Sequence, residues 1–362
     1  MLLSTKGERI ERRLFMNPIV GNEFLLLGGE KVDFPSLMEL CNARAKEEYG
    51  DPLPAEVKER IQRELQYLEG SYELTEAFFS LINVKRSLEP YSWQWATLGP
   101  ITNSLLAYVL GITESDPLEY GLDERFFYRN WHIPEVEVRL AGINEIYRGL
   151  RNVTLFPWAL LTFLDELYKA TGVRPDSISR NDESVMKFFN APICFNQFGV
   201  DIVAEEEFKE IAQEYGVHNF YDFVRVVGFK KSIGAWEGNG RELLQENSSR
   251  RSKLITTRDD VLDLLNELKE MDPDDRFRMT ERIRKGKNLD EVDYQYCFEC
   301  GIPEWEAISL TKIHFLMPRG YCLVYADVLC RLIWYWINYL KDFEKVKQKM
   351  AIEQSDPYQK YC

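Results

Sequence analysis

The sequence predicts a mostly helical α+β fold, in which a small mixed sheet in the first half is followed by a helical region. Apolar residues recur at helical spacing in segments spread over the whole chain, whereas strand-like segments are few and lie early. Residues 321–343 form a long, mostly apolar segment, which favours a helix buried on most sides. We expect a first domain over residues 1–158 and a helical second domain over residues 159–362.

Three segments are typical of amphipathic helices. Residues 54–70 carry apolar residues every three or four positions and end at a glycine. Residues 205–215 repeat this pattern and are followed by Gly216, and residues 259–271 repeat it again before an Asp-Pro pair.

The best strand candidates are residues 23–27, 135–140 and 152–156. The second of them alternates charged and apolar residues, so Glu135 and Glu137 share one face. Between the second and third candidates we expect a turn and one short helix over residues 144–150.

The formal net charge of −14, from 45 basic and 59 acidic residues, argues against a general nucleic-acid coat protein. Local basic runs remain possible phosphate contacts, although such runs are most often solvated helix faces. No apolar stretch approaches the roughly 18 residues of a membrane span. The first residues also lack the apolar core of a signal peptide, so we expect a cytoplasmic protein without membrane contact.

Short segments in a fixed order carry a resemblance that covers about residues 40–345. They are residues 44–54, 104–118, 257–261, 283–287, 302–305 and 317–319. In this order and spacing the chain is similar to the PolC-type α subunit of bacterial DNA polymerase III, a C-family replicative polymerase. The resemblance implies a degenerate palm, made of a small mixed sheet with helices, followed by a helical fingers-like domain.

The resemblance also implies where the family's metal-binding carboxylates would lie. Such polymerases hold two Mg²⁺ ions between carboxylates of neighbouring strands. The family's P-D-I-D strand corresponds to Pro134-Glu135-Val136-Glu137, and its third aspartate corresponds to Thr154. In each glutamate the carboxylate lies one methylene farther from the backbone than in an aspartate. A threonine cannot replace a bridging carboxylate. We therefore expect no working catalytic residue and no metal site, with Glu135 and Glu137 as weak candidates for one ion.

The family's phosphate loop, R-G-S-x-G-S, is also degenerate. The position of its arginine holds Leu98, and Pro100 has no N–H to donate to a phosphate. Gly99 and Ser104 remain as the remnant of the loop.

The family's helical thumb lies between its two catalytic strands, but only 14 positions separate Leu140 from Thr154. We therefore expect the thumb to be absent. We find no sliding-clamp motif in residues 354–362.

Basic residues of the fingers region are better preserved than the metal-binding carboxylates and the phosphate loop. Contact with phosphate needs only clustered cations. The candidates for nucleic-acid contact are Lys230, Lys231, Arg282, Arg284, Lys285, Lys287 and Arg319.

Three interpretations of function remain open. The first is a catalytically inactive pseudo-polymerase that binds nucleic acid or proteins in a replication or mobile-element setting, with weak DNA contact that is independent of base sequence and no cofactor. The second is a minimal metal-dependent DNA polymerase, which would use Mg²⁺ at Glu135 and Glu137. The third is a protein-interaction scaffold without DNA contact, which the negative net charge favours.

Overall fold

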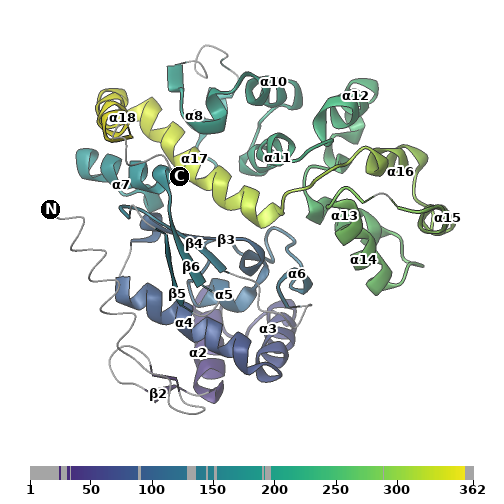
Figure 1. Ribbon diagram of the computed structural model, residues 1–362, viewed down its shortest axis with the longest axis horizontal. Helices are drawn as coiled ribbons and strands as arrows, with labels where there is room; N and C mark the ends of the chain where they lie inside the picture. Colours follow the sequence, from purple (N-terminus) through teal and green to yellow (C-terminus); the bar gives the residue numbers. More distant parts are fainter. Residues whose placement is uncertain are drawn as a thin grey trace. The chain divides into compact units, whose positions relative to one another are not determined.

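The computed structural model describes residues 24–25, 31–32, 34–88, 91–128, 136–143, 146–150, 153–189, 191, 197–287 and 289–354. The chain divides into two compact units (Figure 1). Unit 1 comprises residues 1–177 and 339–362, and unit 2 comprises residues 178–338. The predicted α+β, mostly helical composition is confirmed.

Unit 1 contains a four-stranded mixed sheet with the strand order β3-β4-β6-β5. Its strands are β3 (Trp95–Leu98), β4 (Val136–Leu140), β5 (Tyr147–Leu150) and β6 (Val153–Pro157). β4 pairs antiparallel with β3 and parallel with β6, and β5 pairs antiparallel with β6. The two predicted strands, 135–140 and 152–156, are therefore confirmed as neighbours in one sheet over their described residues. The first strand candidate, 23–27, contributes β1 (Phe24–Leu25), which pairs with β2 (Lys31–Val32).

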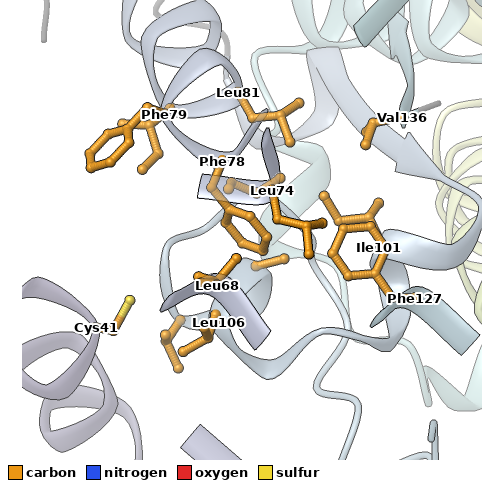
Figure 2. Packing of buried hydrophobic residues seen from close by; sticks show 14 of the residues in the cluster. Cys41, Leu68, Leu74, Phe78, Phe79, Leu81, Ile101, Leu106, Phe127 and Val136 are labelled. Carbon is orange, nitrogen blue, oxygen red and sulfur yellow. The ribbon is translucent and has the colours of Figure 1, made fainter. Parts of the chain in front are cut away.

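The helices that precede β4 build the core of unit 1 with the sheet. They are α2 (Phe34–Tyr49), α3 (Ala55–Glu69), α4 (Tyr72–Leu88), α5 (Leu105–Val109) and α6 (Arg125–Tyr128). The apolar stripe of the predicted helix 54–70 is buried in α3, as its spacing requires. Phe78, Leu106 and Phe127 come together with Val136 of β4 in this core (Figure 2). Alternate residues of β4 are buried, so its Val136 face packs on the core while Glu137 lies on the other face.

Helix α7 (Ala159–Thr171) follows β6 and packs in unit 1 with α18 (Leu340–Gln354) through the rings of Phe163 and Phe343. The Thr162 hydroxyl accepts the N–H of Gly142 at 3.0 Å, just beyond β4. These contacts hold α7 to the sheet, so the expected domain boundary at residue 158 falls inside unit 1. The first segment of unit 1 ends at residue 177, and residues 339–362 also belong to this unit.

Unit 2 is helical in all its named elements. Its α-helices are α8 (Glu183–Phe188), α10 (Glu206–Tyr215), α11 (Phe220–Lys231), α12 (Arg241–Glu246), α13 (Arg258–Glu267), α14 (Pro273–Ile283), α15 (Glu291–Glu299), α16 (Glu304–Thr311) and α17 (Arg319–Asn338). The predicted helix 205–215 is confirmed as α10, which ends at Gly216 with a positive φ of 80°. The predicted helix 259–271 corresponds to α13, and Thr257 and Asp260 form a capping box at its start.

Two local predictions are wrong. Residues 147–150 form strand β5 instead of part of a short helix. With only two residues between β5 and β6, a hairpin can close and pair the free edge of β6. The long apolar segment 321–343 is two helices, because α17 ends at Asn338, whose side-chain amide donates to the Trp334 carbonyl at 2.9 Å. The carbonyl of Tyr339 then accepts the N–H groups of Asp342 and Phe343 as a new helix begins.

Within the part of the chain that the structure describes, no helix is both long and apolar enough to cross a bilayer.

Candidate functional site

Three of the residues that the sequence resemblance singled out lie in one row across the sheet of unit 1. Leu98 of β3 is opposite Glu137 of β4, and Glu137 is opposite Thr154 of β6. Residues directly opposite each other in a sheet lie on the same face. The strand register therefore brings together the positions that, in our sequence-based expectation, correspond to the phosphate-loop arginine and to two metal-binding aspartates.

The carboxylate of Glu137 is engaged by a cation of its own strand. Oε2 of Glu137 accepts a hydrogen bond from Nη2 of Arg139 at 2.9 Å, and the Arg139 guanidinium lies 4.6 Å from the centre of the Phe156 ring on β6. Thr154 is buried beside them. In the described residues no three side chains of the His, Cys, Asp or Glu types gather as a metal-holding group. Glu135, the other weak metal candidate, lies outside the described residues.

The turn that we expected to be the remnant of a phosphate loop is folded into the interior. Gly99 adopts a positive φ of 90°, and residues Pro100–Asn103 form a short 3₁₀ turn. Ser104 is fully buried and caps α5, since its hydroxyl accepts the Ala107 N–H at 3.1 Å. Ser104 therefore has a structural role, and its hydroxyl does not face solvent.

A buried carboxylate, Glu64 of α3, holds this turn in place. Its Oε1 accepts the N–H of Leu105 at 2.8 Å, and its Oε2 accepts the N–H of Leu106 at 3.1 Å and the hydroxyl of Ser104 at 2.7 Å. Arg60 Nε donates to Oε1 at 2.7 Å, and the Tyr128 hydroxyl donates to Oε2 at 3.0 Å. The free N–H groups at the start of α5 are thus satisfied from inside the protein. No sequence motif indicated this role for Glu64.

Three of the predicted nucleic-acid contacts lie in α11 and at the start of α17, where other side chains engage them. Arg319 is buried, and its Nη2 donates to Asp260 at 2.9 Å and to Asp263 at 2.6 Å. Lys230 pairs with Glu205 at 2.6 Å and also with Glu207. Burial lowers the pKa of Lys230, but these hydrogen bonds outweigh it and raise the pKa above its ordinary value. The ammonium of Lys231 lies 4.6 Å from the centre of the Tyr325 ring.

The remaining predicted contacts lie at the end of α14 and in the turn after it, and most are paired. Arg282 donates to Asp290 at 3.1 Å and to Asp293 at 2.7 Å. Arg284 pairs with Glu281, and Lys285 lies 3.5 Å from the same carboxylate. Lys287 is exposed and has no ion-pair partner among the described residues. Of the expected basic patch, the side chains of Lys285 and Lys287 are therefore the most available to a ligand.

Two further exposed basic residues, Lys312 and His314, lie in the segment that contacts this turn, and no pattern in the sequence indicated them. The backbone N–H of Leu316 donates to the carbonyl of Arg284 at 3.0 Å, which ties the segment after α16 to the turn that carries Lys287. Isolated single basic residues give no charge-run signal, so only the tertiary contact identifies them.

Comparison with known proteins gives a match within unit 1. Residues 35–134 match the family described as the bacterial DNA polymerase III alpha NTPase domain. This match contains α2 to α6, β3 and the turn from Gly99 to Ser104. Over part of its length the chain is similar to PolC-type DNA polymerase III.

The similarity to curated PolC-type DNA polymerases III extends over about half of this chain. It is 26% identical to the Clostridium perfringens protein over 189 residues, which are 49% of this chain and 13% of that protein. It is 24% identical to the Thermotoga maritima protein over 207 residues, which are 54% of this chain and 15% of that protein. For the Staphylococcus aureus protein of strain MW2 the identity is 25% over 228 residues, which are 55% of this chain and 16% of that protein. The chain thus spans about one seventh of the length of these relatives.

Proposed function

We propose that this DNA polymerase III homologue is a catalytically inactive pseudo-polymerase, with unit 1 as a degenerate palm and unit 2 as a fingers-like region. The row formed by Leu98, Glu137 and Thr154 is the observation that carries this proposal. Two-metal phosphoryl transfer needs carboxylates from neighbouring strands to hold both ions a few ångströms apart. Here the neighbouring strand offers a buried hydroxyl, and the carboxylate of Glu137 is paired with Arg139.

The described residues therefore do not fit a pair of Mg²⁺ ions. Mg²⁺ demands near-octahedral oxygen coordination, usually with one or two carboxylates and substrate phosphates. Glu135 precedes β4 in the sequence and lies outside the described residues. Carboxylates from one segment of the chain alone would not hold two ions from both sides. Leu98 also has no charge to place against a phosphate.

Primer extension tests this proposal. The full chain, incubated with a primed template, all four deoxynucleotides and either Mg²⁺ or Mn²⁺, should give no extended product. A matched preparation of the variant Glu137→Gln should behave identically. Template-dependent extension that the Glu137→Gln variant lacks would overturn the proposal and establish a minimal metal-dependent polymerase.

The role of such a protein is binding, and we propose contact with nucleic acid through unit 2 in a replication or mobile-element setting. The support is the family relationship and the cations that remain unpaired beside α14, above all Lys287. The ion pairs of Arg282 and Arg284 limit this contact, so we expect it to be weak and independent of base sequence. A protein-interaction scaffold without DNA contact is the second candidate, and these internal ion pairs are the observation that favours it.

A further inference from the structure

We infer that Lys287, Lys312 and His314 form one surface that binds the phosphate backbone of nucleic acid, built where three loops of unit 2 meet. This inference rests on the proposed nucleic-acid contact and specifies where it occurs. It differs from the sequence-based expectation, which placed the contact on Arg282, Arg284, Lys285 and Lys287 together with Lys230 and Lys231.

The first connection in this junction joins the loop after α11 to the loop after α16. Ile233 and Phe315 form an isolated antiparallel bridge, in which the Ile233 N–H donates to the Phe315 carbonyl at 2.8 Å. The Ile233 carbonyl accepts the N–H of His314 at 2.9 Å. The Ser232 hydroxyl also accepts the N–H of Met317 at 3.1 Å. Lys312 and His314 are therefore carried on a segment with a fixed backbone.

The second connection joins this segment to the turn after α14. The Leu316 N–H donates to the Arg284 carbonyl at 3.0 Å, and the backbone of Gly286 approaches that of His314 very closely. A Cβ atom on Gly286 would lie 2.3 Å from the His314 carbonyl oxygen. A Cβ atom on Gly234 would likewise lie 2.1 Å from the carbonyl oxygen of Lys312. Only glycine permits both approaches. Gly286 thus lets the turn that carries Lys287 lie against the backbone of His314, and Gly234 lets the loop after α11 lie against the backbone of Lys312.

The charge state of the junction distinguishes it from the neighbouring basic run. Arg278, Arg282 and Arg284 are engaged by Asp293 or Glu281, so a phosphate would have to compete with a carboxylate already in contact. Lys287 and Lys312 are exposed and have no ion-pair partner within the described ranges. A fixed backbone lowers the entropic cost of binding, and unpaired ammonium groups release counterions from DNA when they bind.

Salt-dependent binding of fluorescently labelled oligonucleotides to the full chain tests the inference. The double variant Lys287→Ala/Lys312→Ala should lower the slope of log K against log salt by about 1.8 on duplex DNA and about 1.4 on single strands. The control is Lys187→Ala/Lys269→Ala, which changes the net charge equally at two exposed lysines of unit 2 away from the junction. This control should leave the slope unchanged. The single variant His314→Ala should weaken binding at constant salt without altering thermal unfolding.

Several outcomes would overturn the inference. An unchanged slope in the Lys287→Ala/Lys312→Ala variant, or an equal fall in the control variant, would show that the junction is not the contact. Poly-glutamate competing as strongly as DNA of equal charge would indicate a site for acidic proteins. Absence of nucleic-acid binding at low salt would overturn the inference and favour the scaffold function, while the primer-extension result would still decide catalytic inactivity by itself.

Discussion

Glu137 on β4 and Thr154 on β6 lie directly opposite each other in a parallel strand pair. The short chain between these strands accommodates β5, which pairs with the far edge of β6. Two aspartates placed opposite each other in this register could share metal ions. Here, however, the position on β6 holds Thr154, whose hydroxyl-bearing side chain is buried. This pair therefore offers a direct test of how well the position of Thr154 tolerates a carboxylate.

We expect Thr154→Asp to destabilise the protein relative to Thr154→Asn, on the order of 2 kcal/mol above pH 7, because it places a carboxylate at a buried position next to the more exposed carboxylate of Glu137. Burial and the neighbouring charge raise the pKa of the introduced group above that of the unfolded chain. The difference between the two variants should therefore shrink as the pH falls through that raised pKa. Urea unfolding at pH 8 and pH 5 measures it. Equal stability of the two variants at both pH values would show that the position is open to solvent.

Glu64 is the buried acceptor that joins α3 to the start of α5, and Arg60 is its charged partner. We expect Glu64→Gln to lower the free energy of unfolding by about 3–5 kcal/mol, because it removes one partner of a buried ion pair. Arg63→Gln is the control, since it breaks an ion pair with Glu124 in which the Arg63 side chain is half exposed; its cost should stay below about 1 kcal/mol. Thermal unfolding compares the two. Similar melting temperatures for both variants would contradict the role of Glu64.

Asp260 should couple the stability of the protein to acidic pH. Burial alone raises the pKa of Asp260, but Arg225, Arg319 and the hydroxyl and N–H of Thr256 together hold it well below its ordinary value. A carboxyl with a lowered folded-state pKa contributes stability above its unfolded pKa of about 4, and this contribution is lost as the pH falls toward the folded value.

Asp260→Asn should therefore destabilise the protein at pH 7 and flatten the dependence of stability on pH between about 5 and 2. Asp51→Asn, which breaks an exposed ion pair with Lys46, is the control and should leave that dependence nearly unchanged. Denaturant unfolding across this pH range measures both. A wild-type slope in the Asp260→Asn variant would contradict the assignment.

Gly286 and Gly238 both have a positive φ, of 65° and 72°, but only Gly286 lies against another backbone. We expect Gly238→Ala to cost about 1–2 kcal/mol, the strain of the left-handed conformation alone. Gly286→Ala should cost about 1–3 kcal/mol more, because its Cβ must displace the carbonyl of His314. Equal losses in denaturant unfolding would show that the loop junction relaxes freely.

The sequence by itself determined the local structure and the family relationship. The apolar spacing of residues 54–70 and 205–215 predicted α3 and α10, and the alternation around Glu137 predicted β4 with its charged face. These signals are local in the sequence, because the spacing of apolar side chains follows the repeat of a helix or a strand directly. The order of short motifs likewise required no knowledge of contacts.

Only the tertiary structure decided which of the predicted residues can act. In the structure Arg319 is buried against Asp260, Arg284 is paired with Glu281, and the segment that carries His314 is tied to the turn that carries Lys287. Residues 147–150 form a strand because they pair with the edge of β6. These outcomes depend on groups that are distant in the sequence and meet only when the loops close. A run of basic residues in the sequence does not show which carboxylates will form ion pairs with it in the folded protein.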